Sequence, residues 1–426
     1  MAVNSIYDEL KWRGMVYDQI DGVENLLNTK KVTLYNGFDP TADSLHVGHM
    51  VPLIALARFQ RFGHNVLALA GGGTCMIGDP SGRSTERNLL NADEVHHNVE
   101  CIKKQLAHFL DFDVKSNPAR IVNNMDWLGQ LNMIEFLRDT GKYFTINYML
   151  AKDSVKNRME RESGLSYTEF SYMLLQSFDF YHLHNEYGCE LQCGGSDQWG
   201  NIVAGTELIR RKTGDTVYGL TYPLIRKSDG TKFGKTASGA VWLDPKRTSP
   251  YKFYQFWLNT DDADVIHYLK FYTFYNEEEI NGLEAETKDH PEARAAQKTL
   301  ARELTLMMHG QTALDKAEQA SRALFGGDIH GLSADDIADV FSEVPGCDVA
   351  ADRLGGEGLS VVDLFVESGL MKSKGEARRE IQGGGVYLNN ERVTDAAATV
   401  TVSDAIEGKY IILRRGKKNY SLVSVR

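Results

Sequence analysis

The order of secondary-structure signals between residues 31 and 71 is the strongest constraint on the fold. Residues 31–38 (KVTLYNGF) are rich in strand-forming residues, a break follows, and residues 48–62 have helical periodicity. Residues 65–71 (NVLALAG) then form a continuous apolar run of the kind found in buried parallel strands. Strand, helix and strand in this order predict an α/β fold with a Rossmann-like, doubly wound parallel sheet.

The rest of the chain changes character in steps, and its 426 residues suit two or three domains. We expect the Rossmann-like domain over residues 1–222 and a loop region over 223–248. Long helical periodicity then predicts a helical domain over 249–325. A passage rich in Gly and Asp predicts a linker with a short helix over 326–358, and two helices followed by strands predict a small α+β domain over 359–426.

Charge is unevenly distributed along the chain. The net charge is -11, yet residues 359–426 hold 11 basic and 8 acidic residues. The basic excess is greatest at residues 409–418, which contain no acidic residue. This asymmetry predicts a polyanion partner for the tail, and a solvated edge hairpin is the alternative interpretation.

Cysteine usage and hydropathy bear on the compartment. The five cysteines are an odd, scattered set in a chain too long to need disulfides, which is typical of a reducing compartment. No apolar run approaches the roughly 18 residues of a membrane span, and residues 1–14 lack the apolar core of a signal peptide. We therefore expect a cytoplasmic protein without membrane contact.

A first candidate site is the segment 38–49 (FDPTADSLHVGH), between the first strand and the next helix. Ligands bind at this edge of an open α/β sheet, where a helix N-terminus favours an anion. His46 and His49 are three residues apart and can donate to phosphate oxygens. A bare pair of histidines is weak evidence, but its place after a strand predicts a phosphate site.

A second candidate is the glycine-flanked segment 228–236 (SDGTKFGKT). Lys232 and Lys235 on such a loop can neutralise an anion, and the glycines allow the loop to move. Alone, this segment is typical of a solvated turn. Its functional interpretation depends on the histidine site.

A buried helix is expected to start at Ser166, because residues 166–169 (SYTE) have a capping-box pattern and apolar residues follow on most sides. Tyr172, Gln176 and Asp179 fall on one stripe of this helix. Buried polar groups need partners, so the stripe faces a polar network or a ligand.

Two glycine-rich turns, residues 70–82 and 192–198, close two strands without the spacing of a dinucleotide site or a P-loop. His182 and His184 with Cys189 and Cys193 could be imagined as a zinc site, but their spacing argues against one. We expect no zinc and no other protein-bound metal.

Taken together, these motifs resemble the bacterial-type tyrosyl-tRNA synthetases, which are class I aminoacyl-tRNA synthetases. Residues 46–49 (HVGH) match the HIGH signature and residues 232–236 (KFGKT) match the KMSKS loop. Tyr35, the helix stripe and residues 194–201 (GGSDQWGN) resemble the tyrosine-specific members. Residues 373–379 (SKGEARR) and 386–389 (VYLN) resemble an S4 RNA-binding domain.

The resemblance implies a tyrosine–tRNA ligase that uses ATP with Mg²⁺, L-tyrosine and tRNA(Tyr). It implies no tightly bound cofactor. The implied catalytic residues are His46, His49, Thr41, Lys232, Lys235 and Thr236. The implied tyrosine-binding residues are Tyr35, Asp79, Tyr172, Gln176, Asp179 and Gln198. ATP and the adenylate are expected to contact Gly37, Asp39, Gln192, Gly195, Asp197 and Lys235.

The resemblance also implies a homodimer, with an interface in an insertion at about 124–165, and tRNA binding by the tail. The implied tRNA-binding residues are Lys374, Arg378, Arg379, Arg414, Arg415, Lys417 and Lys418. Arg83 and Arg87 could contact phosphate or belong to a solvated loop. Arg294, Lys298 and Arg302 form a basic helical stripe for which solvation is the preferred interpretation.

Three alternatives stay open on sequence alone. A tryptophan-specific relative shares the fold and the signatures, but Asp179 and Tyr35 suit a phenol better than an indole. A synthetase-derived RNA-binding protein would lack catalysis, although both histidines and both lysines are present. A small nucleotidyltransferase with a His-x-Gly-His motif would lack the lysine loop and the tail.

Overall fold

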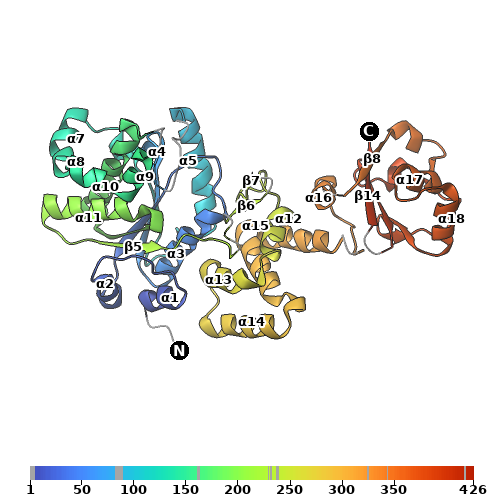
Figure 1. Ribbon diagram of the computed structural model, residues 1–426, viewed down its shortest axis with the longest axis horizontal. Coiled ribbons are helices and arrows are strands. Elements are labelled where there is room, and N and C mark those ends of the chain that lie inside the picture. The colour runs from blue at the N-terminus through green and yellow to red at the C-terminus, as the bar shows by residue number, and fades with distance from the viewer. Residues whose placement is uncertain are drawn as a thin grey trace. The chain divides into compact units, whose positions relative to one another are not determined.

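The computed structural model of the chain (Figure 1) describes residues 5–81, 90–160, 164–228, 230, 233–236, 239–323, 326–342, 344–416 and 419–426. For residues 154, 235 and 236 it describes the backbone alone. The chain forms two compact units. The first consists of Met1–Arg247 and Thr260–Leu300, and the second of Thr248–Asn259 and Ala301–Arg426.

A parallel five-stranded sheet forms the centre of the first unit. Its strand order is β3-β2-β1-β4-β5, and every neighbouring pair is parallel. The strands are β1 (Thr33–Phe38), β2 (Asn65–Ala70), β3 (Arg120–Asn123), β4 (Cys189–Gly195) and β5 (Tyr218–Tyr222). The strand order changes direction at β1, which creates the switch point where ligands bind in such sheets. The predicted doubly wound α/β fold is confirmed.

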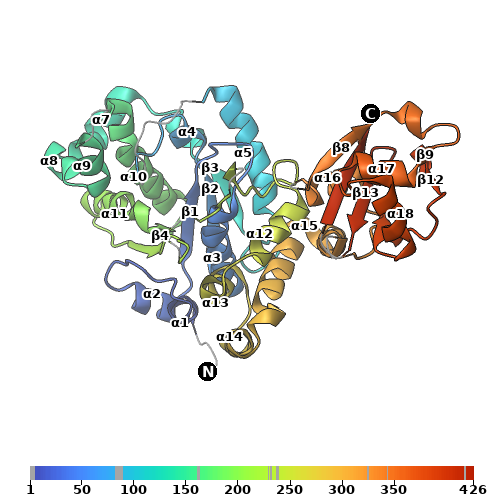
Figure 2. The ribbon, with the colours of Figure 1, turned by 45° about the vertical axis from the view of Figure 1, so that its right-hand side comes forward.

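Helices cover both faces of this sheet. Helix α3 (Met50–Arg61) packs on β1 and β2, and α5 (Ala92–Leu106) packs on β2. Helices α10 (Tyr167–Tyr187) and α11 (Trp199–Thr213) pack on β4 (Figure 2). Because crossovers between parallel strands are right-handed, the two directions of winding place these pairs of helices on opposite faces.

The buried helix α10 is anchored at its first turn. The Ser166 hydroxyl accepts a hydrogen bond from the Glu169 amide, as the capping pattern predicts. The Glu169 carboxylate forms a buried bidentate ion pair with Arg158, at 2.8 and 2.9 Å. Two parallel hydrogen bonds between planar groups fix direction as well as distance. This pair therefore holds α10, and the polar stripe it carries, against the preceding segment.

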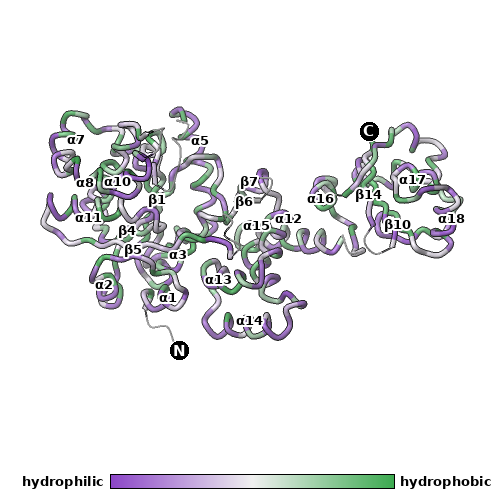
Figure 3. The backbone as a smooth tube through the Cα atoms, viewed as in Figure 1, coloured by the Kyte–Doolittle hydropathy of each residue, from purple (hydrophilic) through white to green (hydrophobic). Residues whose placement is uncertain are grey.

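The first unit contains further helices and strands, and hydrophobic and hydrophilic residues are mixed along its helices (Figure 3). They are α1 (Ile6–Trp12), α2 (Val23–Thr29), α4 (Gly72–Cys75), α6 (Met125–Leu128), α7 (Met133–Asp139), α8 (Ile146–Leu150), α9 (Asp153–Met159), α13 (Asp262–Tyr272), α14 (Glu277–Asp289), β6 (Lys235–Thr236) and β7 (Gly239–Ala240). Buried Arg13 and Arg58 both donate to the carbonyl oxygens of Lys270 and Thr273 at the end of α13.

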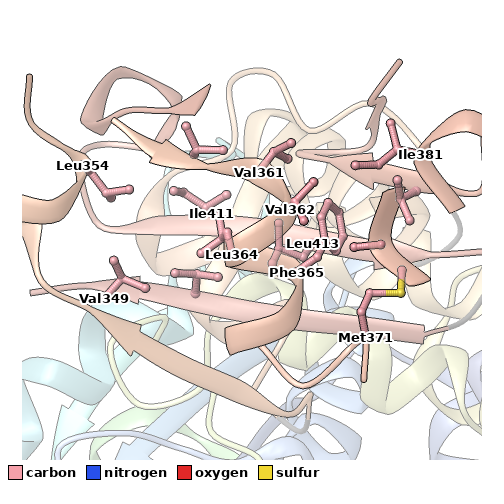
Figure 4. Close-up of a cluster of buried hydrophobic side chains, with 14 of the residues drawn as sticks. Val349, Leu354, Val361, Val362, Leu364, Phe365, Met371, Ile381, Ile411 and Leu413 are labelled. Atoms are coloured by element: carbon pink, nitrogen blue, oxygen red, sulfur yellow. The ribbon is translucent and has the colours of Figure 1, made fainter. Parts of the chain in front are cut away.

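The second unit contains a mixed five-stranded sheet of order β11-β10-β13-β14-β8. The pair β14 and β8 is parallel and the other neighbouring pairs are antiparallel. Its core lies between this sheet and two helices, with Phe365, Ile411 and Leu413 among the buried side chains (Figure 4). The elements are α12 (Pro250–Leu258), α16 (Ala334–Val340), β8 (Gly346–Val349), β9 (Leu359–Ser360), α17 (Val361–Glu367), α18 (Lys374–Gln382), β10 (Val386–Leu388), β11 (Glu391–Arg392), β12 (Thr399–Val400), β13 (Tyr410–Arg415) and β14 (Asn419–Val425). The predicted helix, helix, strand order of the tail is confirmed.

Two predicted boundaries need correction. The predicted helical domain at 249–325 does contain helices, but Thr260–Leu300 belongs to the first unit and the rest to the second. Helix α15 (Ala295–Ala323), which is interrupted at Gly310, runs across the division. The predicted linker at 326–358 contributes β8, whose Cys347 pairs with Val423 of β14. The Gly and Asp residues of this segment suggested a linker. A strand as short as β8 needs few apolar residues, so the composition did not reveal it.

In the part of the chain that the structure describes, no helix combines the length and the apolar character needed to cross a membrane.

Candidate active site

His46 and His49 lie in a single 3-10 turn, Val47–His49, between β1 and α3. The Nδ1 of His46 accepts from the Gly48 amide at 3.1 Å, and the Nδ1 of His49 accepts from the His46 amide at 3.2 Å. The rings are stacked with centroids 3.9 Å apart. Because both Nδ1 atoms are acceptors, the proton of each neutral ring is on Nε2, which makes that atom a donor suited to an anion.

Glycine at position 48 lets the His46 ring lie against the backbone of this turn. A Cβ atom on Gly48 would lie 2.9 Å from Cε1 of His46, closer than side chains tolerate. The chain segment at Val241 also holds the turn in place, because the Val47 amide donates a hydrogen bond to the Val241 carbonyl oxygen at 3.0 Å. The histidine turn is therefore held rigidly before any ligand arrives.

Asp39 and Thr41 follow β1 directly. Asp39 accepts from the Tyr172 hydroxyl at 2.9 Å and from the Thr74 hydroxyl at 2.8 Å. A Cβ atom on Gly71 would lie 2.1 Å from an Asp39 oxygen, so the glycine-rich turn lets the carboxylate approach β2. Thr41 is exposed next to this carboxylate.

Asp179 is buried on α10 with 1% of its surface exposed. Its two carboxylate oxygens accept from Asn124 Nδ2 at 2.9 Å and from Trp127 Nε1 at 2.7 Å. Burial raises the pKa of Asp179 to about 8, against the opposing effect of these two hydrogen bonds and with a smaller contribution from the charge of Asp39. The carboxyl group is thus held by donors, yet its burial makes ionisation costly in free energy.

Tyr35 on β1 is equally buried, and its hydroxyl has no hydrogen-bond partner among the described residues. Burial raises the pKa of Tyr35 well above its ordinary value, and the charge of Asp179 raises it further. A buried hydroxyl without a partner is rare in folded proteins. Such a group next to a carboxylate of raised pKa is the pattern expected where a polar ligand completes the hydrogen bonding.

The other predicted polar residues join a second network. Gln198 donates to Asp79 at 2.7 Å, and Asp79 also accepts from the Ser81 amide at 2.9 Å. Asn201 on α11 donates to Gln176 at 3.0 Å and to Gln198 at 3.2 Å. The polar stripe on α10 therefore divides between two networks. Tyr172 donates directly to Asp39, and Asp179 is linked to Asp39 through Asn124 and Thr74. Gln176 is linked to Asp79 through Asn201 and Gln198.

Gln192, Gly195 and Asp197 lie along β4 and the turn that follows it. Gln192 is buried, and its carbonyl oxygen has no partner among the described residues. Asp197 is an exposed residue. A Cβ atom on Gly195 would lie 2.7 Å from a carboxylate oxygen of Asp197. Gly37 lies at an exposed position in β1. These residues share the carboxyl edge of the sheet with Asp39.

The lysine segment can be placed only in part. Lys232 lies outside the described residues, and so do the side chains of Lys235 and Thr236. Phe233 is buried and its ring centroid lies 5.1 Å from that of Tyr268 on α13. Gly234 adopts a φ of +75°, and a Cβ atom there would lie 3.0 Å from Val47 Cγ2. Gly234 therefore lies against Val47 of the histidine turn, and the pairing of the lysines with the histidines stays a prediction.

Sequence reasoning missed Asn124, Trp127, Thr74 and Asn201 as members of the site. Asn124 and Trp127 follow β3, so they lie at the carboxyl edge that the predicted sheet topology already marked. Their place directly after a strand was the sequence signal that could have identified Asn124 and Trp127.

The predicted basic residues of the tail fall into two groups. Arg414 is largely buried, donates to Asn390 and Gly416, and lies 3.6 Å from the ring centroid of Tyr387. Arg415 is paired with Glu376 and Glu380, and Lys374 with Asp363. Contacts within its own unit thus hold the Arg414 guanidinium, and its role in tRNA binding stays a prediction.

Arg378 and Arg379 are exposed on α18, and no ion pair within the described residues involves either. Lys417 and Lys418 lie outside those residues, as do Arg83 and Arg87.

The structure also places the histidines considered for zinc and part of the basic stripe at 294–302. The His182 ring stacks on Trp127 with centroids 4.3 Å apart, and His184 Nδ1 lies 2.9 Å from the Cys189 carbonyl oxygen. In the stripe on α15, Arg302 is paired with Glu318. No group of three His, Cys, Asp or Glu that could hold a metal occurs within the described ranges.

Comparisons with known proteins agree along the chain. Residues 27–326 match the family model "tRNA synthetases class I (W and Y)", and residues 336–423 match "Tyrosine–tRNA ligase SYY-like C-terminal domain". The chain is 57% identical to the tyrosine–tRNA ligase of Roseiflexus castenholzii over 421 residues, which are 99% of each chain. It is 52% identical to tyrosine–tRNA ligase 1 of Bacillus subtilis over 428 residues, which cover both chains completely.

Among solved structures, a C-terminally truncated mitochondrial tyrosyl-tRNA synthetase of Aspergillus nidulans is similar, with a TM-score of 0.68 and 34% identity. This likeness covers 76% of the present chain and 95% of that chain.

Proposed function

Because the chain belongs to the class I tRNA synthetase family of the tryptophan and tyrosine enzymes, we propose that it is a tyrosine–tRNA ligase. It activates L-tyrosine with ATP to tyrosyl-adenylate and pyrophosphate. It then transfers the tyrosyl group to the 3'-terminal ribose of tRNA(Tyr). One observation carries the choice of tyrosine, namely the buried Asp179 carboxylate next to the unpartnered hydroxyl of Tyr35.

The tyrosine pocket is assigned from the two polar networks. Asp179 and Tyr35 receive the phenolic hydroxyl of the substrate. Tyr172, Gln176 and Asp79 bind its α-ammonium group, because carboxylate, carbonyl and phenol oxygens all accept hydrogen bonds. Gln198 completes the pocket through Asp79. A tryptophan-specific site is disfavoured because an indole N–H can only donate. A phenol oxygen can donate to Asp179 and also accept from the Tyr35 hydroxyl.

The ATP site is assigned to the carboxyl edge of the sheet. The Nε2 donors of His46 and His49, with Thr41, stabilise charge at the α-phosphate as the carboxylate of tyrosine attacks. Lys232, Lys235 and Thr236 bind the leaving pyrophosphate. This catalysis is positioning and electrostatic stabilisation without a covalent enzyme intermediate. Gly37, Asp39, Gln192, Gly195 and Asp197 line the ribose and adenine region, and Mg²⁺ arrives with the phosphates of ATP.

The test is exchange of labelled pyrophosphate into ATP without tRNA, run in parallel with tyrosine, phenylalanine and tryptophan. Exchange with tyrosine alone is the expected result. Exchange with tryptophan would move the assignment to the other branch of the family. No exchange with any of the three amino acids would favour an RNA-binding protein without catalysis. Measuring the affinity for tRNA would then test that alternative.

The homodimer is supported by the distribution of exposed apolar side chains. Ten large hydrophobic residues of the described chain are exposed, and six of them fall between residues 133 and 167. They are Met133, Ile134, Leu137, Ile146, Met159 and Tyr167. A monomer rarely concentrates apolar surface in this way. We assign the interface to this segment, within the predicted insertion at about 124–165 and its immediate continuation.

Ile134→Asp is expected to dissociate the dimer. Ile134 is 70% exposed in the isolated chain. A two-fold interface contains each substitution twice, so losing two buried isoleucines costs about 3–6 kcal/mol, or roughly 10²–10⁴-fold in Kd. Sedimentation at micromolar concentration measures the change. Tyr17→Asp, at an exposed aromatic outside the segment, is the control that stays dimeric. A wild-type monomer would contradict the assignment.

The tail is assigned to tRNA binding through its unpaired basic residues. Arg378→Ala with Arg379→Ala is expected to leave pyrophosphate exchange unchanged and to weaken tRNA binding. The slope of log Kd against log salt falls by about two, one unit per lost phosphate contact. Arg353→Ala with Arg426→Ala removes the same charge from ion-paired positions of the same unit, and its slope stays at the wild-type value. Equal slopes in the two variants would refute the assignment.

A cytoplasmic location remains a prediction from the free cysteines, which are unpaired in each described case.

A further inference from the structure

Asn201 connects the side chains that we assign to the ammonium group of the substrate. It lies in the first turn of α11 and only 4% of its surface is exposed. Its Nδ2 atom is 3.0 Å from Gln176 Oε1, 3.2 Å from Gln198 Oε1 and 3.4 Å from Ser81 Oγ. One amide group with two N–H donors thus faces two glutamine carbonyl oxygens.

The hydrogen bonds of this network have only one consistent direction. Asp79 is a carboxylate and can only accept, so Gln198 must present its NH₂ group to Asp79, at 2.7 Å. The carbonyl of Gln198 then faces Asn201, which must present its own NH₂ group. Since Asn201 donates, Gln176 must turn its carbonyl oxygen toward it. The orientation of three amides therefore follows from one carboxylate.

This orientation matters for a cationic ligand. The two ends of a glutamine amide have nearly the same shape, so packing alone does not decide which end faces the pocket. An ammonium group requires acceptors and is repelled by an NH₂ group. A carbonyl oxygen has two lone pairs, so Gln176 can accept from Asn201 and from the ligand together.

We propose that Asn201 is a positioning residue for the α-ammonium group of tyrosine, acting by fixing the carbonyl of Gln176 and the contact between Gln198 and Asp79. Asn201 itself does not touch the substrate. The inference deepens the proposed function and depends on it. Removing the donor frees Gln176 to turn its NH₂ group toward the ligand, and the affinity for ammonium-bearing ligands falls.

The experiment compares three ligands in the full-length Asn201→Leu variant, which keeps the size of the side chain and removes its donors. Tyrosine has both charged groups, tyramine has the ammonium group without the carboxylate, and 3-(4-hydroxyphenyl)propionate has the carboxylate without the ammonium group. We expect Kd to rise roughly 10- to 100-fold for tyrosine and for tyramine. The Kd for the propionate stays within about two-fold of wild type, which also reports an intact phenol pocket.

A second variant guards against misfolding. Asn201→Ser keeps one donor, so its loss for tyrosine and tyramine is intermediate. Thr206→Val serves as the control, because Thr206 lies on the same helix and its hydroxyl donates to the Val203 carbonyl, with no other partner among the described residues. In pyrophosphate exchange, the KM for tyrosine rises in the Leu and Ser variants while the KM for ATP does not.

Two outcomes overturn the inference. Equal weakening of all three ligands in both variants would mean that Asn201 has a general structural role. Unchanged affinity for tyramine would mean that the glutamine orientation does not depend on it. Failure of the proposed function is distinguishable, because the wild-type protein would then show no tyrosine-dependent exchange at all.

Discussion

Asp179→Ala is expected to lower the preference for tyrosine over phenylalanine, as a ratio of kcat/KM, by at least about 100-fold. The carboxylate is buried and held by Asn124 and Trp127, so it cannot turn away when a ligand without a hydroxyl enters. Phenylalanine supplies no further donor to this carboxyl group, and a buried polar group left short of a hydrogen bond is costly. Rejection of roughly 10⁵ is the value known for tyrosine-specific synthetases themselves, so the geometry supplies its reason rather than its size.

Pyrophosphate exchange with the two amino acids measures this ratio. Tyr35→Phe is the matched variant, because it removes the other hydroxyl contact and leaves the carboxylate in place. Its effect on the ratio is smaller, roughly ten-fold. If the ratio of kcat/KM for tyrosine to that for phenylalanine is unchanged in Asp179→Ala, the assignment of the phenol site is wrong, whatever the absolute rate of the variant.

The same carboxylate gives the preference a pH dependence of known sign. The pKa of Asp179 is raised to about 8, so below that pH the unliganded pocket holds a neutral acid. The phenol of tyrosine donates to the ionised form, so kcat/KM for tyrosine rises as pH increases through about 8. Phenylalanine meets a less costly neutral group at lower pH, so its kcat/KM does not rise. A ratio that is constant between pH 6.5 and 9 would contradict this account of discrimination.

The fold was predictable where local signals agreed with one another. Strand, break, helix and apolar strand between residues 31 and 71 fix a parallel βαβ unit, and β1, α3 and β2 lie within one or two residues of expectation. The stripe on α10 was predictable for a different reason. A helix that is apolar on most sides must be buried, and its polar residues then require partners.

The partners of that stripe were not predictable in the same way. Asp179 meets Asn124 and Trp127 only because β3 and β1 flank β2, which brings the end of β3 to the helix. Sequence spacing of more than 50 residues contains no such information. The contacts of Arg414 were not predictable either. A basic run predicts an exposed surface for a polyanion, while the ring of Tyr387 and the amide of Asn390 contact its guanidinium.

The second large expected effect concerns the histidine turn. His46→Ala and His49→Ala are each expected to lower kcat for pyrophosphate exchange by about 10²–10³, the usual loss when one preorganised donor to a transition state is removed. The KM for tyrosine stays near wild type, because neither ring contributes to the assigned tyrosine pocket. The rings are stacked at 3.9 Å, and His49 also accepts from the His46 amide, so each supports the other.

That mutual support makes the double variant the sharper measurement. Removing one ring already disturbs the turn, so the two losses are expected to combine to less than their product, as for groups that act together. His290→Ala, an exposed histidine of the same unit, is the control and keeps the wild-type rate. Losses that multiply fully would show two independent donors instead of one preorganised pair. Full activity in either single variant would remove the histidines from the chemistry, because no rearrangement of a rigid turn could replace a missing Nε2 donor.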